Sequence, residues 1–179
     1  MGDPTGTPTA GDRIIGPLAQ AIHIFSAYWV LVLALIILVD VSGRVFLNSP
    51  LLGAPEIIKN SVVSITFLQL PLAIYRGGML RTTIVYDMVG PIGKRLVRTL
   101  SSLLGLAFFL GTAWSSWEPA VEAFDIGEYE GEGALRVPTW PVRFLVFATA
   151  AFSAVVYLHL VWLDWTGRFD DDEEEIVGV

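Results

Sequence analysis

The sequence predicts an all-α membrane protein with four transmembrane helices, and three observations support this class. The 179 residues are 54% hydrophobic and only 16% charged, with a mean hydropathy of +0.62, well above an ordinary soluble domain. Four apolar stretches are long enough, or nearly so, to cross a hydrocarbon layer of about 30 Å at about 1.5 Å per residue. Residues 31–39 and 103–110 are apolar all round, whereas the helices of a soluble bundle, the alternative class, carry a polar face.

The charge and the residue inventory exclude several functions. The net charge is −7, but six of the acids stand together at residues 170–175, so the rest of the chain is close to neutral. This balance disfavours nucleic acid as a partner. There is no cysteine, which excludes disulfides and thiolate metal sites. The two histidines, His23 and His159, have no second ligand at helical spacing, so we expect both to be packed or interfacial.

The first part of the chain contains a tail, an interfacial segment and the surest span. Residues 1–13 are rich in Gly, Pro and Thr and are predicted as a flexible tail. Residues 14–25 fit a short helix lying in the membrane interface, with Pro17 in its first turn, where the missing N–H has no cost. The first span is predicted at residues 22–42, because residues 14–39 contain no Asp, Glu, Lys or Arg.

Three further apolar stretches complete the membrane domain. These spans are predicted at residues 57–75, 97–118 and 141–163. Lys59 and Asn60 lie near the start of the second span, where a lysine fits an interface anchor and a place on a conduction path is the alternative. The four-helix domain is therefore predicted over residues 14–167, followed by an acidic C-terminal tail at residues 168–179.

The basic residues of the short loops predict the orientation. The loop between the second and third spans carries one acid, Asp87, and five bases, which are Arg76, Arg81, Lys94, Arg95 and Arg98. Short loops rich in Lys and Arg remain in the cytoplasm. The loop between the third and fourth spans is acidic and is expected on the opposite side. Four spans with the basic loop inside place both termini in the cytoplasm.

Polar residues gather at the connection between the first two spans. Asp40 and Arg44 are four residues apart, close enough to pair on one helix face. Asn48 and Pro50 indicate a helix end and a short connection. Glu56 then opens the next helix, where a carboxylate complements the helix dipole. We expect an ion pair from Arg44 to Glu56, and the alternative is a polar cluster that docks a partner or a lipid headgroup.

Small residues mark faces where helices approach closely. They are Ser101, Gly105, Ala107, Gly111 and Ser115 in the third span and Ala148, Ala150, Ala151, Ser153 and Ala154 in the fourth. The same faces serve packing within the chain or contact with another protein, and the sequence leaves both open.

No pattern of residues indicates catalysis or unaided transport. The chain has no phosphate-binding loop, no Ser/His/Asp set and no paired carboxylates on one helix face, so we do not expect an enzyme. It also lacks the internal repeat or midplane carboxylates of a transporter that acts alone. An accessory membrane subunit is the favoured function. The alternative is a free-standing four-span channel or transporter that works as a homo-oligomer.

Three motifs resemble the small membrane subunit of the tripartite ATP-independent periplasmic (TRAP) transporters, the DctQ-like family. The first motif comprises Arg44, Phe46, Asn48, Pro50, Leu51 and Glu56. The second runs from Arg76 through Arg81 to Asp87, and the third contains Pro138, Trp140 and Pro141. The resemblance covers residues 22–163, with the same four spans, and implies structural or partner-binding roles for the residues of these motifs.

The resemblance implies a complex in the cytoplasmic (inner) membrane of a bacterium or archaeon. A large DctM-like membrane subunit would carry the substrate and sodium sites and move like an elevator. A DctP-like extracytoplasmic binding protein would deliver an organic acid. The present chain would be a fixed scaffold in contact with membrane lipid, without a cofactor of its own. The acidic outer loop, residues 118–132, is a candidate dock for the binding protein, and a solvated loop kept flexible by its glycines is the alternative.

Overall fold

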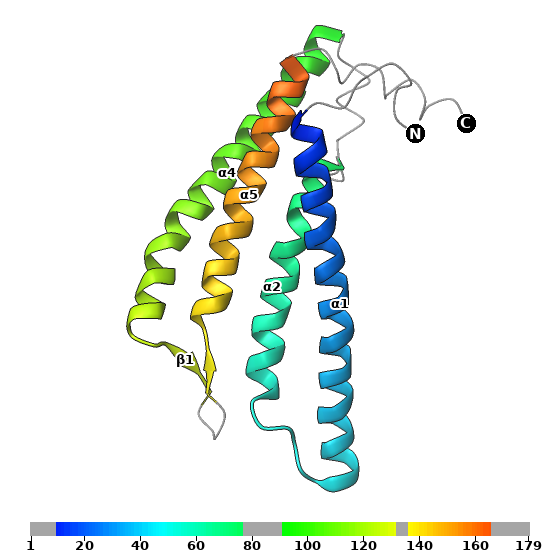
Figure 1. Ribbon diagram of the computed structural model, residues 1–179, viewed down its shortest axis with the longest axis vertical. Coiled ribbons are helices and arrows are strands. Elements are labelled where there is room, and N and C mark those ends of the chain that lie inside the picture. Colours follow the sequence, from blue (N-terminus) through cyan, green and yellow to red (C-terminus); the bar gives the residue numbers. More distant parts are fainter. Residues whose placement is uncertain (1–9, 77–90, 132–135, 166–179) are drawn as a thin grey trace, which may run out of the picture.

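Four long helices and one short hairpin make up the structure, a computed structural model that describes residues 10–76, 91–131 and 136–165 (Figure 1). The elements are α1 (Ala10–Leu47), α2 (Ala54–Tyr75), α4 (Pro91–Asp125), β1 (Tyr129–Glu130), β2 (Val137–Pro138) and α5 (Trp140–Trp165). Each helix is long and apolar enough to cross a membrane. The predicted class, an all-α membrane protein with four transmembrane helices, is confirmed.

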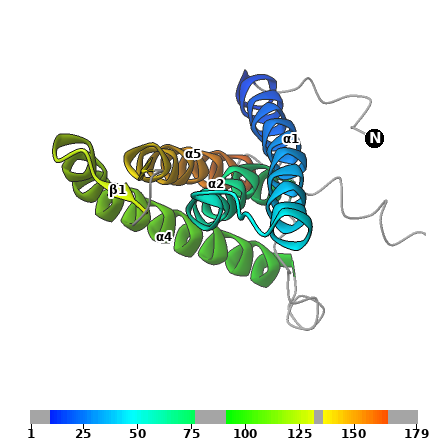
Figure 2. The same cartoon turned by 90° about the horizontal axis from the view of Figure 1, so that it is seen from below.

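The helices form a layer rather than a closed bundle (Figure 2). α5 packs on both α4 and α2, and α2 packs in turn on α1, so the order across the layer is α4, α5, α2, α1. The two inner helices are the more enclosed. In the most apolar 18-residue window of each helix, 33% is buried in α2 and in α5, against 11% in α1 and in α4. Because successive helices run in opposite directions, α1 and α4 start at the end where α2 and α5 finish (Figure 1).

Small side chains on α5 and α4 allow these two helices to pack closely. Ala150 and Ala154 of α5 are buried in a core that also contains Phe109 and Tyr157, whose rings stack with centroids 5.8 Å apart. Gly105 of α4 lies against the Tyr157 ring, where an added Cβ would come within 2.5 Å of it. The small faces at these positions therefore serve packing within the chain.

α1 contacts the rest of the layer through one narrow stripe. Its buried residues are Ala19, Ser26, Leu33 and Asp40, each seven residues after the last. The Ser26 hydroxyl donates to the Ile65 carbonyl of α2 at 3.4 Å. The large side chains elsewhere on α1, such as Leu31 and Leu35, are mostly exposed. A seven-residue repeat keeps one seam of a helix against its neighbour, so the other described elements leave most of the apolar surface of α1 uncovered.

The start of α1 differs from the sequence prediction. The helix begins at Ala10, within the predicted tail, and continues unbroken through residues 14–25, so the separate interfacial helix is wrong. Pro17 lies inside the helix rather than in its first turn. There it removes one backbone hydrogen bond and its ring crowds the carbonyl four residues earlier, so the position has a cost that the first turn would not. At 38 residues, α1 is about 57 Å long, longer than a hydrocarbon layer of about 30 Å.

The other helices also extend beyond their predicted spans. α4 continues to Asp125, so Glu118 and Glu122 are helical rather than part of a loop. The predicted tail up to residue 9, the basic loop at residues 77–90 and the acidic tail at residues 168–179 lie outside the described residues.

Replacing Gly105 with Ala should destabilise the α4–α5 pair. The new methyl group would overlap the Tyr157 ring, which cannot move freely because it is buried against Phe109. We expect a loss of about 1–3 kcal/mol, measured as thermal unfolding in detergent. Gly111→Ala is the matched control, since its Cβ would meet nothing within 4 Å. Equal stability of the two variants would contradict this packing.

Candidate functional site: polar ties at the two ends of the layer

Asp40 organises the connection between α1 and α2. Its Oδ2 accepts a hydrogen bond from Arg44 Nε at 2.9 Å, and its Oδ1 accepts one from the Leu51 backbone N–H at 2.9 Å. The Asp40 side chain is 9% exposed and that of Arg44 is 52% exposed. One carboxylate thus joins the last turns of α1 to the chain that leads into α2.

Backbone geometry in the same connection depends on particular residues. Asn48 ends α1 with φ 47°, in the left-handed region that Asn tolerates better than most residues. The Ser49 N–H donates to the Gly43 carbonyl at 3.1 Å, and an added Cβ at Gly43 would lie 2.6 Å from the Ser49 carbonyl oxygen. Gly53, with φ 76°, precedes α2. The chain reverses here within six residues, 48–53, because these positions accept such geometry.

The predicted ion pair between Arg44 and Glu56 is not formed. Among the described residues Arg44 pairs with Asp40, while Glu56 stands in the first turn of α2 without an ion pair. The reason is geometric: a partner four residues away on the same helix is already in place, whereas Glu56 belongs to the next helix. Glu56 does occupy the helix start where a carboxylate complements the dipole, as expected.

The end of α4 is closed by a glycine motif that leads into the hairpin. The Glu128 N–H donates to the Ala123 carbonyl at 2.8 Å and the Gly127 N–H to the Phe124 carbonyl at 3.2 Å, with Gly127 at φ 62°. This is a Schellman cap. β1 and β2 then pair antiparallel, with Tyr129 opposite Pro138 and Glu130 opposite Val137.

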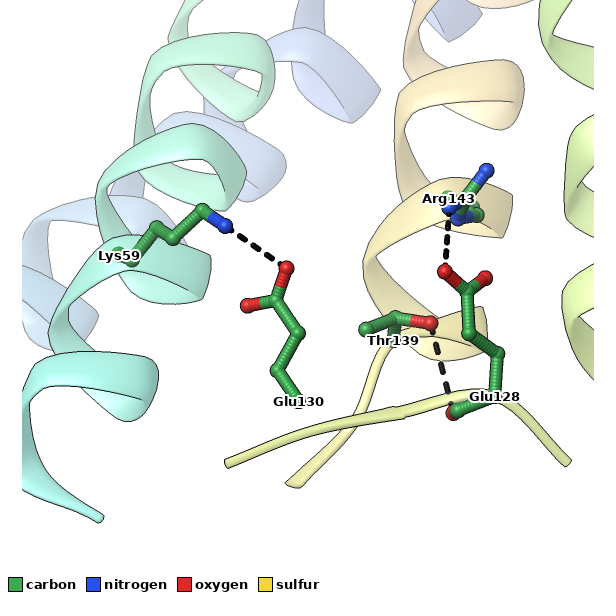
Figure 3. A network of polar contacts seen from close by, with 5 residues as sticks. All are labelled: Lys59, Glu128, Glu130, Thr139 and Arg143. Carbon is green, nitrogen blue, oxygen red and sulfur yellow. Dashed lines mark hydrogen bonds and ion pairs between the residues drawn. The ribbon is translucent and has the colours of Figure 1, made fainter. Parts of the chain in front are cut away.

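Charged side chains tie this hairpin to two helices (Figure 3). We call Lys59, Glu128, Glu130, Thr139 and Arg143 the hairpin clamp. Lys59 of α2 donates to Glu130 at 2.7 Å, and Arg143 of α5 donates to Glu128 at 2.8 Å. The Thr139 N–H and hydroxyl both donate to the Glu128 carbonyl, at 3.1 and 3.4 Å. The hairpin therefore connects α2 with α5, which an entirely solvated loop would not do.

Another polar cluster lies at the opposite end of the layer. Asp12 Oδ1 of α1 lies 2.9 Å from His159 Nε2 of α5 and accepts a hydrogen bond from the Tyr75 hydroxyl of α2 at 3.3 Å. The His159 ring is buried, stacks on Trp162 and approaches Gly11 so closely that an added Cβ would clash at 2.4 Å. These contacts join three helices, and we call Asp12, Tyr75 and His159 the inner cluster.

The structure places most of the sequence-predicted site residues at the hairpin end of the layer. Those at the α1–α2 connection are Asp40, Arg44, Asn48, Pro50 and Glu56, and those at the hairpin and the start of α5 are Pro138, Trp140 and Pro141. The Trp140 ring packs edge-on against Phe124 of α4, with centroids 5.4 Å apart. Arg81 lies outside the described residues. The roles proposed for these residues in binding partners stay predictions.

Sequence reasoning missed both the hairpin clamp and the inner cluster. Lys59 and Glu130 are 71 residues apart, and Asp12 and His159 are 147 apart, so no local pattern links them. One signal was available: Asp12 stands seven residues before Ala19, in step with the buried stripe of α1. Within the described part of the chain no group of three or more His, Asp or Glu residues is arranged to hold a metal ion.

Four membrane-spanning helices, with polar side chains that tie their ends together, define a small multi-pass membrane protein. A family model described as "Tripartite ATP-independent periplasmic transporters, DctQ component" matches residues 33–167. The chain therefore belongs to the DctQ family, the small permease component of TRAP transporters. No curated protein matches the chain. The family assignment agrees with the resemblance found in the three sequence motifs.

Replacing Asp40 with Ala should loosen the α1–α2 connection. The change leaves the Leu51 N–H and the Arg44 guanidinium without their acceptor, and we expect a loss of about 1–3 kcal/mol in detergent unfolding. Asp40→Asn, which keeps an acceptor oxygen, should cost less. Glu56→Ala is the control, because it loses only a dipole interaction of about 0.3–1 kcal/mol. A larger effect at Glu56 would show that Asp40 is not the anchor.

Reversing the charge of Lys59 should release the hairpin without unfolding the protein. Because the Lys59 side chain is 66% exposed, the ion pair contributes less than about 1 kcal/mol to global stability. We expect Lys59→Glu to speed hydrogen exchange at residues 128–131, and the double variant Lys59→Glu/Glu130→Lys to restore slow exchange. If the double variant exchanged as fast as the single one, the ion pair would not be what holds the hairpin.

Proposed function

We propose that this chain is the fixed scaffold of a TRAP transporter in the cytoplasmic (inner) membrane of a bacterium or archaeon. It supports a large DctM-like subunit that carries the sodium and substrate sites and moves like an elevator. A DctP-like extracytoplasmic binding protein delivers an organic acid to that subunit. This chain then needs no sodium site or cofactor of its own.

The observation that carries this proposal is where the charged side chains lie and what they do. In the described residues the charged side chains make these contacts at the helix ends. Asp40, paired with Arg44 on α1, accepts a hydrogen bond from the Leu51 N–H of the following turn. Lys59 joins α2 to the hairpin, and His159 of α5 lies against Asp12 of α1. Between them, the buried hydroxyls of Ser64 and Thr149 bond to carbonyls of their own helices, those of Asn60 and Leu145. Groups used to hold helices together support a static role rather than transport of a solute through the layer.

The orientation is part of the proposal. The basic loop between α2 and α4 faces the cytoplasm, together with both termini and the inner cluster. The hairpin clamp and the α1–α2 connection then lie on the outer side. There the hairpin is positioned toward the binding protein. Lys59, the residue first considered for a conduction path, is engaged with Glu130 on that side, which favours the scaffold over a free-standing channel.

Reconstitution tests the proposed function. Uptake of a labelled organic acid into proteoliposomes, driven by a sodium gradient and supplied by the binding protein, should require both this chain and the large subunit. The chain alone should give no flux. As a control, deletion of the six acids at residues 170–175 should leave assembly and uptake intact. Full uptake by the large subunit without this chain, or flux through this chain alone, would contradict the scaffold.

A further inference from the structure

α4 carries two helix-packing seams on opposite faces, and the described residues of the chain cover only one of them. The covered seam faces α5 and consists of Leu106, Phe109, Ala113, Ser116, Ala120 and Ala123. The uncovered seam, which we call the second seam, consists of Leu100, Leu104, Ala107, Gly111, Trp114, Glu118, Val121 and Asp125. Both alternate spacings of three and four residues, the pattern by which two helices stay in contact over many turns. Figure 2 shows that the side of α4 away from α5 faces outward.

The middle of the second seam is shaped for a helix rather than for lipid. Ala107, Gly111 and the neighbouring Ser115 are exposed at four-residue spacing, and Gly111 has open space for 4 Å around a built Cβ. Lipid tails place no demand on residue size, whereas small residues let a second backbone approach. The exposed face of α1 is different. Its large side chains, such as Leu31, Leu35 and Leu38, are about as exposed as Leu100 and Leu104 of the second seam, but exposed small residues do not recur on α1 at four-residue spacing.

A groove with an acidic end runs beside the outer half of the second seam, on the flank of α4 next to α5. Its walls include Leu110, Trp114, Trp117 and Val121 of α4 and Phe147 of α5. It ends at three carboxylates, those of Glu118, Glu122 and Asp125. Trp114, 87% exposed, stands at the centre of this surface. The groove thus offers an apolar length followed by negative charge.

The three carboxylates lie where negative charge is unfavourable. They stand in the last two turns of α4, where the helix dipole is already negative, and the last turn has no base. None of the three forms an ion pair or a hydrogen bond with another described residue. Glu128 and Glu130, by contrast, each have a cation within 2.8 Å. Cations from outside the chain would relieve the repulsion among Glu118, Glu122 and Asp125.

We propose that the second seam of α4 is the docking surface for a transmembrane helix of the large membrane subunit. That helix lies close to Gly111 and carries Lys or Arg at its outer end, beside Glu118, Glu122 and Asp125. Charge complementarity selects this occupant, because an uncharged lipid tail leaves the carboxylates unpaired and a second copy of α4 would bring like charges together in a parallel pair. The inference rests on the proposed function, since it specifies the face used for the partner named there.

Cysteine cross-linking tests the surface directly, because the natural chain contains no cysteine. Gly111→Cys and Ser115→Cys, on the second seam, and Leu35→Cys, on the exposed face of α1, are labelled with a photoactivatable maleimide in the complex with the large subunit. We expect adducts with the large subunit from positions 111 and 115, several-fold more than from position 35. Stronger adducts from position 35, or adducts only between two copies of this chain or with lipid, would overturn the proposal.

Charge neutralisation supplies the second measurement. Glu118→Gln/Glu122→Gln/Asp125→Gln should reduce the large subunit recovered with this chain several-fold, while the chain alone unfolds at the same or a higher temperature. Asp170→Asn/Asp171→Asn/Asp172→Asn, which removes the same amount of negative charge from the C-terminal segment, is the matched control and should leave recovery unchanged. If the complex forms and transports but the triple variant and the cross-links show no preference for α4, the docking face is wrong and the scaffold function stands. If uptake never needs this chain, both fail.

Discussion

Close packing against α5 is the contact on which the rest of the layer depends. In lipid, apolar surface gains little by moving from tails to another helix, so helices associate through close approach and polar contacts. α5 provides this on two sides, toward α4 and toward α2. Its buried Ala150, Ser153 and Ala154 bring backbones together, and Tyr157 fills the space that Gly105 leaves. Without α5, the α1–α2 pair and α4 would have little to hold them in one layer.

The polar ties matter because the packing in the middle is so narrow. Only one residue in every seven of α1 is buried, and so narrow a contact alone would let the helix rotate or slide against α2. Asp40 fixes its last turns to the connection, and Asp12 fixes its first turns to α2 and α5. Both are anchored within the same stripe. Ties at the ends and close packing in the middle together make a stiff layer, which is what a fixed subunit needs if a partner moves against it.

The sequence was a good guide to the helices and a poor one to their contacts. Four apolar runs predicted four spans because chain length and hydropathy are local properties, and the i, i+4 pair of Asp40 and Arg44 was readable for the same reason. Hydropathy could not show that α1 starts at Ala10, because its first turn is polar and is stabilised by His159, far away in the chain.

The mistaken ion pair between Arg44 and Glu56 has a similar origin. Two carboxylates competed for one guanidinium, and the sequence does not show how the connection turns. The turn depends on a left-handed Asn48 and on Gly43 beneath the Ser49 carbonyl, and it brings the Leu51 N–H, rather than Glu56, to the Asp40–Arg44 pair. Glu130 shows the converse. Its position in an acidic loop suggested a solvent-exposed side chain, but the pairing of β1 with β2 places it where it forms an ion pair with Lys59.

The two outer helices of the layer are not equivalent, and their difference indicates which side faces lipid and which side faces a partner. α1 has one seam and presents large aliphatic side chains elsewhere, so lipid satisfies it. α4 has a second seam that contains small residues and ends in carboxylates that oppose its own dipole. A partner on α4 would press on the helix whose other face holds α5, the most extensive helix–helix contact among the described residues. Force from a moving partner would then act first on the α4–α5 pair, while α1 remains in contact with lipid.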